Sequence, residues 1–472
     1  MNFEAVIGLE IHVEMRTASK MFSSSPIRFG AEPNTLVQPL DMAHPGTMPV
    51  VNKQAVIHAI RVCDALHMEI DRELWFDRKN YFYADLPKGF QITQDKRPIG
   101  RNGHLDLIVD GQEKRIEIER LHMEEDTCKQ LHFSDYSLLD YNRAGIPLIE
   151  IVTRPNIRSG IEAMKYVETI RQIVTYAGVS DGKMEEGSLR CDVNISLRPY
   201  GVSTYGTKVE IKNLNSIANV EKAIDFEMRR QEKLLLSGTP VRQETRRYDE
   251  TKKETILMRV KTDAVDYKYF TEPNIVPIRL TEAFIMDAIA SRPELADQKK
   301  NRYVSQFGLS DYDADILLLD QEVARYFDEA VLTTKQPKLL ANWHNGEIAS
   351  YLNKEGKSIR SLGISSNHLA QLMNMIDSGT LSNKQAREIF TQMLQKDEDP
   401  QSIAKRLNMM QISDPEVIMQ FIKDVLDQNA QSIEDFKNGK DRAVGFLIGQ
   451  IMKKAGGKIN PSLTSELLLK EL

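Results

Sequence analysis

The chain of 472 residues contains only three cysteines, Cys63, Cys128 and Cys191, which are odd in number and far apart. This pattern argues against a disulfide framework and a thiolate zinc site, and it favours a reducing cytoplasm. No apolar run approaches the roughly 20 residues that a membrane-spanning helix needs, so we expect no membrane. The first 15 residues lack a basic start and include Glu4 and Glu10, which does not fit a signal peptide.

The chain also lacks a large excess of either charge. Its net charge is −6, with 41% hydrophobic and 28% charged residues, which is the balance of a soluble globular protein. The length allows about three domains. A negative net charge argues against attraction to nucleic acid along the whole chain. A local basic stretch near the C-terminus is the exception, and it contains Lys440, Arg442, Lys453, Lys454 and Lys458.

The common nucleotide-binding signatures are missing as well. There is no Gly-x-x-x-x-Gly-Lys-Ser/Thr, no dinucleotide fingerprint and no Gly-x-Ser-x-Gly. The sequence has instead a strand in which Glu10, His12 and Glu14 alternate with apolar residues. Successive side chains of a strand point to opposite faces, so these three point to one side. A nucleotide site in this chain would need carboxylates on a sheet to hold a metal ion.

Further acids occur in segments of the same kind. Two carboxylates about 4 Å apart repel by roughly 4 kcal/mol at a surface-like dielectric, so a convergent set needs a cation. Oxygen ligands suit Mg²⁺. Glu150 lies inside an otherwise apolar strand and needs a partner or an ion. For any single acid, a solvated or ion-paired strand residue is an equally good interpretation. The candidates are Glu10, Glu124, Glu125, Glu150, Glu185, Glu186, Asp192 and Glu210.

Cations that could bind phosphate lie near these acids. Arg190 and Asp192 share one strand face, which suits a phosphate held by a guanidinium and a metal ion, although an internal ion pair is the alternative. Tyr81 could stack on a base or belong to the core. The candidate cations are Arg78, Lys79, Arg143, Lys183, Arg190 and Lys212.

Hydrophobic periodicity predicts a sheet-rich first part. The expected strands are 6–15, 105–109, 115–120, 148–152, 189–197 and 208–212. The expected helices run from Ser159 to Gly178 and from Ser216 to Gly238. Residues 23–53 show no periodicity, which is typical of a functional loop or lid. Together these segments indicate an α+β fold with a mainly antiparallel sheet.

The remainder reads as helical. From Thr281 onward, capping residues precede amphipathic stripes. We expect a catalytic domain at 1–290, a helical domain at 291–405 and a small helical tail at 406–472. The polar stretch 396–400 is the expected linker before the tail.

Several motifs in the same order resemble the B subunit of the bacterial aspartyl/glutamyl-tRNA amidotransferases. The resemblance runs over essentially the whole chain, and its main segments are 8–12, 121–126, 139–152, 184–194, 210–216 and 445–449. It implies a first domain related in fold to glutamine synthetase and guanidino kinases, then a helical domain and a YqeY-like tail.

The resemblance also implies an activity. ATP would phosphorylate the side-chain carboxylate of misacylated Glu-tRNA(Gln) or Asp-tRNA(Asn), and ammonia would then form the amide. An amidase A subunit would supply the ammonia, and a small C subunit would complete a heterotrimer.

The same resemblance assigns residues to this activity. Lys79, Tyr81 and Arg190 would lie near the nucleotide, with Lys183 as a further candidate. Mg²⁺ and ATP would be held by Glu10, His12, Glu125, Glu150, Asp192 and Glu210. Independently of the resemblance, the basic stretch of the tail is where we expect contact with tRNA, through Lys453, Lys454 and Lys458, although a solvated helical face is the alternative there.

Two other functions remain open from the residues alone. A metal-dependent RNA phosphohydrolase could use the same carboxylates and would cleave tRNA without ATP. A non-catalytic tRNA-binding adaptor would show no Mg²⁺-dependent ATP binding. The resemblance, rather than the composition, favours the amidotransferase.

Overall fold

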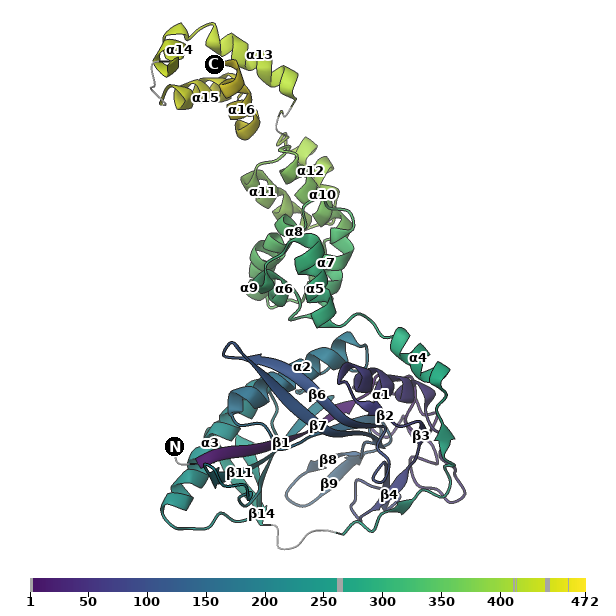
Figure 1. Ribbon diagram of the computed structural model, residues 1–472. Coiled ribbons are helices and arrows are strands. Elements are labelled where there is room, and N and C mark those ends of the chain that lie inside the picture. The colour runs from purple at the N-terminus through teal and green to yellow at the C-terminus, as the bar shows by residue number, and fades with distance from the viewer. Residues whose placement is uncertain (1–2, 261–265, 411, 413, 438–441, 457) are drawn as a thin grey trace. The chain divides into compact units, whose positions relative to one another are not determined.

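The computed structural model of the chain describes residues 3–260, 266–410, 412, 414–437, 442–456 and 458–472. It forms two compact units, Met1–Ala296 and Asp297–Leu472. The first unit is rich in strands and the second is helical (Figure 1). In the part of the chain that is described, every helix is too short or too polar to cross a membrane.

A large, mainly antiparallel sheet dominates the first unit. Strands β12 and β13 form its one parallel pair among the described residues. In spatial order the strands are β14 (Glu254–Val260), β13 (Glu244–Asp249), β12 (Val209–Lys212), β11 (Leu189–Pro199), β1 (Phe3–Glu14), β10 (Pro147–Thr153), β7 (Gln112–Glu125), β6 (Gly100–Val109) and β2 (Glu69–Ile70).

Helices cover one face of this sheet. The apolar residues of β1, including Leu9, Ile11 and Val13, are fully or almost fully buried and alternate with its polar residues. Helices α2 and α3 pack against the sheet (Figure 1). Their apolar stripes meet the apolar face, which leaves the ionisable face to the other side. The helices of this unit are α1 (Lys53–Ala65), α2 (Gly160–Tyr176), α3 (Ile217–Leu236) and α4 (Glu282–Ala290).

Small sheets and a long irregular segment complete the first unit. Residues 15–52 contain no helix or longer strand and run up to Asn52, whose side chain caps α1. The small sheets are β15 (Phe270–Thr271) with β4 (Asp77–Asn80) and β5 (Phe90–Thr93), β16 (Ile278–Arg279) with β3 (Glu73–Leu74), and β8 (Lys129–His132) with β9 (Ser137–Asp140).

The second unit begins with a set of short helices. Ser382 and Gln385 form a reciprocal capping box at the start of α11, and Asp399 caps α12. These helices are α5 (Ala296–Phe307), α6 (Asp311–Leu317), α7 (Gln321–Val331), α8 (Pro337–Trp343), the π-helix η1 (His344–Ile348), α9 (Ala349–Glu355), the 3₁₀ turn η2 (Ile359–Ser361), α10 (Ser366–Asp377), α11 (Asn383–Met393) and α12 (Pro400–Arg406).

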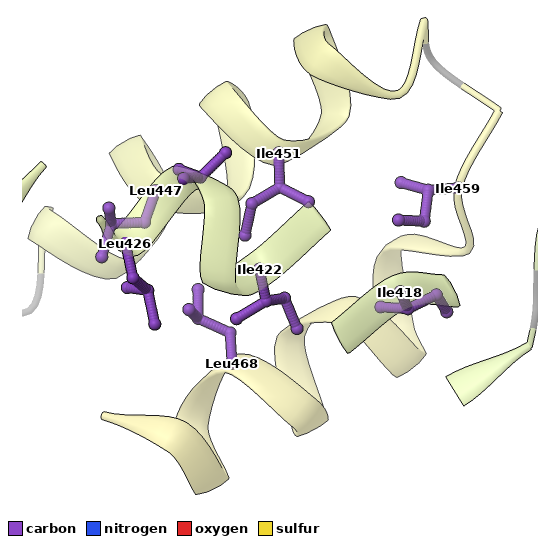
Figure 2. Close-up of a cluster of buried hydrophobic side chains, with 8 residues drawn as sticks. Ile418, Ile422, Leu426, Leu447, Ile451, Ile459 and Leu468 are labelled. Carbon is purple, nitrogen blue, oxygen red and sulfur yellow. The ribbon is translucent and has the colours of Figure 1, made fainter. Parts of the chain in front are cut away.

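The last helices have a hydrophobic core of their own. Ile418, Ile422 and Leu426 lie four residues apart on one face of α13, and Leu447 and Ile451 do so on α15. Figure 2 shows these side chains gathered between the helices. The helices are α13 (Pro415–Leu426), α14 (Ala430–Lys437), α15 (Arg442–Lys454) and α16 (Pro461–Glu471).

The structure confirms the predicted strands and the two predicted helices. Ser159 caps α2 through its side chain, whereas Ser216 precedes α3 without making such a hydrogen bond. Helix α1 was not predicted. The stretch 396–400 connects α11 to α12, and since α12 packs on α10 and α11, it is not a linker between domains. The boundary at 405/406 and the kinship with glutamine synthetase and guanidino kinases stay predictions.

Candidate active site

Five neighbouring strands, β12, β11, β1, β10 and β7, carry the ionisable face of the large sheet. The register places Glu10 opposite Asp192 and His12 opposite Glu150. Glu150 in turn lies opposite His122 on β7. Because the apolar side chains of each strand are buried on the other face, these groups are brought together.

The first acidic group consists of His12, Glu124 and Glu150, whose ligand atoms all lie within 4.8 Å of one another. Nε2 of His122 is 3.1 Å from Oε2 of Glu150 and 3.4 Å from Oε2 of Glu124. Nε2 of His12 is 3.5 Å from Oε2 of Glu150. Thr93 donates a hydrogen bond of 3.2 Å to Glu124. The Glu150 carboxylate therefore lies between two imidazoles.

These contacts shift the pKa values of His12, His122 and Glu150. Burial alone would lower the pKa of both histidines, but Glu150 and Glu124 outweigh it, so the pKa of His12 is raised and that of His122 is raised to about 9. Burial alone would raise the pKa of Glu150, but His122 and His12 hold it well below its usual range. Positive charge is thus strongly favoured beside these carboxylates.

The second acidic group consists of Glu10, Asp192 and Glu210, again with ligand atoms within 4.8 Å of one another. Nζ of Lys212 binds Asp192 and lies 3.4 Å from Oε1 of Glu210. Asn194 donates a hydrogen bond of 2.8 Å to Glu10. Burial and the neighbouring carboxylates raise the pKa of Glu10. Burial alone would lower the pKa of Lys212, but Asp192 and Glu210 raise it.

Glu124, and not Glu125, joins the first acidic group, whereas the sequence prediction named Glu125. Glu124 lies two residues from His122 on β7, so both side chains point to the ionisable face, whereas Glu125 points to the other side. The Glu125 carboxylate accepts hydrogen bonds from Lys88 and from the Ile92 backbone N–H. His122 and Asn194 were not proposed from sequence, although their alternation with Glu124 and Asp192 was the available signal.

The residues predicted near a nucleotide lie in two places. Arg190 of β11 donates a 2.7 Å hydrogen bond to Asp126. Lys79 of β4 has its Nζ 4.8 Å from the ring centroid of Tyr267 and 5.8 Å from that of Tyr81. The two tyrosine rings meet edge to face with centroids 6.0 Å apart. Lys79 and Tyr81 thus belong to one cluster, in which the Lys79 ammonium makes cation–π contacts with the tyrosine rings.

A cavity of about 1030 Å³ opens beside both acidic groups. Its lining includes His12 from the first group and Asp192 from the second, together with Arg143, Arg190 and Lys212. This volume is at the upper end of the range for small-molecule and cofactor sites. One member of each acidic group, His12 and Asp192, therefore faces the same space as these three cations that can hold phosphate.

The loop before β11 lines the cavity with acidic residues, and Lys183 of the same loop does not line it. Glu185 and Glu186 both line the cavity. Lys183 is not part of the lining, and its Nζ is 2.5 Å from Oε1 of Glu186.

The basic residues of the tail lie in the second unit. Lys453 and Lys458 are exposed. Nζ of Lys454 is 2.9 Å from Oδ2 of Asp424 on α13. Lys440 lies outside the described residues.

Comparisons with known proteins place the chain in a family. Residues 5–286 match the family described as GatB/GatE catalytic domain, and residues 325–472 match the one described as GatB domain. The chain is 51% identical to the B subunit of the aspartyl/glutamyl-tRNA(Asn/Gln) amidotransferase of Bacillus cytotoxicus, over all of this chain and 99% of that protein. It is 50% identical to the protein of the same name from Bacillus thuringiensis, again over all of this chain and 99% of that protein.

The chain belongs to the family of amidotransferase B subunits. Both acidic groups, the cavity and the cluster of Lys79 and Tyr81 fall within the segment that matches the GatB/GatE catalytic domain. Lys453, Lys454 and Lys458 fall within the segment that matches the GatB domain. The family resemblance inferred from the motifs is thereby confirmed.

Proposed function

We propose that this chain transfers a phosphoryl group from ATP to the side-chain carboxylate of misacylated Glu-tRNA(Gln) or Asp-tRNA(Asn), and that ammonia then displaces the phosphate. The products are Gln-tRNA(Gln) and Asn-tRNA(Asn). Membership of the family of amidotransferase B subunits supports this reaction. The observation that carries its placement is the pair of acidic groups beside one cavity lined with basic side chains.

The chemistry explains why the site needs cations more than a nucleophile. Ammonia attacks a carboxylate poorly because oxide would have to leave, whereas an acyl phosphate releases phosphate. Phosphoryl transfer is promoted mainly by positioning and by neutralisation of the transferred charge. Arg143, Arg190 and Lys212 line the cavity and can provide this neutralisation.

The donors of the two acidic groups fit divalent cations. The second acidic group offers carboxylate oxygens, which suit Mg²⁺. Lys212 already places a positive charge against Asp192 and Glu210, where a cation would lie. The first acidic group adds an imidazole, which also suits transition metals. A bound Mg²⁺ would neutralise phosphate oxygens and orient the transferred group. The proposed ligands are Glu10, His12, Glu124, Glu150, Asp192 and Glu210.

Four residues are proposed to bind ATP itself. Arg190 lines the cavity and presents a guanidinium suited to phosphate. Lys79 would bind a phosphate, and Tyr81 would stack on the base. Lys183 would have to release Glu186 to reach the nucleotide.

The relatives are named as B subunits, which supports a complex of several chains. We propose an amidase A subunit that releases ammonia from glutamine, and a small C subunit that completes a heterotrimer in the cytoplasm. Lys453, Lys454 and Lys458 of the tail would bind tRNA phosphates.

The test is to co-express the chain with its A and C partners and to follow labelled Glu-tRNA(Gln). We expect Gln-tRNA(Gln) to form only when ATP and an ammonia source are present. Glu150→Gln should abolish this conversion, whereas Glu119→Gln, at an exposed position of the same sheet, should not. Cleavage of the RNA without ATP would instead support a phosphohydrolase. Failure of the intact chain to bind ATP with Mg²⁺ in calorimetry would support an adaptor.

A further inference from the structure

Asp126, which directly follows β7, is a charged residue held in a buried place. It is 5% exposed. Its backbone N–H donates to Ile146 and its carbonyl accepts from Gly145, each at 2.9 Å, while Oδ1 accepts a 2.8 Å hydrogen bond from the Thr127 N–H. Gly145 has φ +85°, and a Cβ there would come within 3.2 Å of Oδ1 of Asp41. The turn that fixes Asp126 therefore requires glycine.

The other oxygen of Asp126 faces two guanidinium groups. Oδ2 accepts a 2.7 Å hydrogen bond from Nη2 of Arg190 and lies 3.6 Å from Nε of Arg143. Arg143 also donates from Nε to the Thr127 carbonyl at 3.1 Å and from Nη2 to the Cys128 carbonyl at 3.2 Å. The Asp126 carboxylate, which also shares a hydrogen bond with Glu14, and the backbone that follows it thus orient both arginines.

Both arginines line the cavity and keep unused donors. Among the described residues, Arg190 makes one hydrogen bond and Arg143 makes two, whereas each guanidinium has five N–H groups. Guanidinium forks match the geometry of phosphate and carboxylate oxygens. Two guanidiniums on one cavity wall, beside the acidic groups, therefore suit a negatively charged ligand.

We propose that Asp126 is a positioning residue that holds Arg143 and Arg190 as a joint binding site for an oxyanion of the substrates, either a phosphoryl group or a carboxylate. The inference rests on the proposed function, in which a phosphoryl donor and a carboxylate acceptor meet in this cavity. Asp126 touches neither reactant itself and acts through the arginines.

The test measures binding to the complex with its A and C partners. The variants are Asp126→Asn, the pair Arg143→Lys/Arg190→Lys and the triple variant that combines all three changes, with Asp106→Asn as a matched control. Asp106 forms an exposed bidentate pair with Arg115, at 2.7 Å for each bond, away from the cavity. The ligands are a non-hydrolysable ATP analogue, Glu-tRNA(Gln) and uncharged tRNA(Gln).

We expect Asp126→Asn to weaken one ligand about tenfold in a complex that still folds, while the binding of uncharged tRNA stays unchanged. Weaker binding of the ATP analogue identifies a phosphoryl group, and weaker binding of charged tRNA alone identifies the carboxylate. The triple variant should bind no more weakly than Arg143→Lys/Arg190→Lys, because the aspartate acts through these two arginines. The Asp106→Asn control should bind every ligand like the unmodified complex.

A further loss of affinity in the triple variant, or unchanged affinities in a folded Asp126→Asn complex, would overturn the proposal. If Asp126→Asn does not fold, Arg143→Lys and Arg190→Lys test the pair directly, and unchanged affinity in both overturns it. Binding is measured without turnover, so this test does not depend on the activity assay. If the unmodified complex makes no Gln-tRNA(Gln), the proposed function is rejected, but the binding affinities of the variants still decide whether Asp126 positions the arginines.

Discussion

At the scale of single residues, Glu150 shows how a carboxylate is accommodated in an apolar strand. A buried, unpaired charge costs several kcal/mol, so the side chain needs a positive partner. His122 and His12 provide it, at 3.1 and 3.5 Å. The same two histidines lower the pKa of Glu150 and keep it ionised. Glu150 is thereby kept as a negatively charged candidate ligand for a metal ion on the sheet.

The choice between adjacent carboxylates on β7 leads to the first prediction. We expect Glu124→Gln to weaken Mn²⁺ binding about tenfold or more, because it removes an oxygen from the first acidic group. Glu125→Gln is the matched control, since its carboxylate binds Lys88 and the Ile92 N–H instead. Titration with Mn²⁺, followed by the electron paramagnetic resonance of the free ion, measures both. Loss of binding in Glu125→Gln alone would contradict the assignment.

The site could be predicted where neighbouring residues in the sequence determine it, and could not where the pairing of distant strands does. The alternation at Glu10 and His12 is local, so the sequence alone was enough to place both on one face. The choice of Glu124 over Glu125 needed the pairing of β7 with β10, which brings Glu150 opposite His122. That register is a long-range property, and no local pattern contains it.

At the scale of elements, strand length separates what could be predicted from what could not. The long strands of the large sheet show clear alternation, and all those expected are present. Strands β4, β5 and β15 have two to four residues, too few for a period, and they pair across distant parts of the chain. Helix α1 did carry signals, a capping Asn52 and an apolar stripe, but they follow directly on the irregular segment.

The π-helix η1 leads to the second prediction, on pH. It begins at His344, whose imidazole is 3% exposed and contacts the rings of Tyr326 and Phe327. Burial lowers its pKa to about 3, below the ordinary value of about 6.5. Between these values the unfolded chain binds a proton that the folded chain does not. Stability therefore falls as the pH decreases through this window.

We expect His344→Phe, which keeps an aromatic ring in this place, to remove that dependence. The free energy of unfolding of the unmodified chain, relative to the variant, should fall by about 2 kcal/mol between pH 7.5 and 5. Urea unfolding of the second unit can be followed through the fluorescence of Trp343, in a Trp75→Phe background. Parallel pH curves for the two proteins would show that His344 is not held neutral.

At the scale of the whole molecule, the function could not be derived from composition. A net charge of −6 gives no hint of an RNA substrate, and the acidic groups alone fit a hydrolase as well as a phosphoryl transferase. The ordered motifs decided between these functions, and the matches over 5–286 and 325–472 support that decision. The chain around the small core of α13, α15 and α16 carries a local basic surface of three exposed lysines, Lys453, Lys454 and Lys458, which the net charge of the whole chain conceals.

That surface carries the last prediction. Replacing Lys453, Lys454 and Lys458 by Ala should raise the KM for aminoacyl-tRNA and leave ATP turnover with small acceptors unchanged, because phosphate contacts supply affinity rather than chemistry. Lys454 is bound to Asp424, so its single replacement should have the smallest effect. Lys354, Lys357 and Lys384, which are exposed elsewhere in the second unit, provide a triple-alanine control of equal charge.

Filter binding over a series of salt concentrations distinguishes direct phosphate contact from a general effect of charge. Each lost contact lowers the slope of log affinity against log salt by up to about 1, so the tail variant should lose up to about 3 and the control almost nothing. Equal slopes for the two triple variants would mean that the tail lysines are merely solvated. In that case the tRNA would have to be bound by surfaces outside this basic stretch.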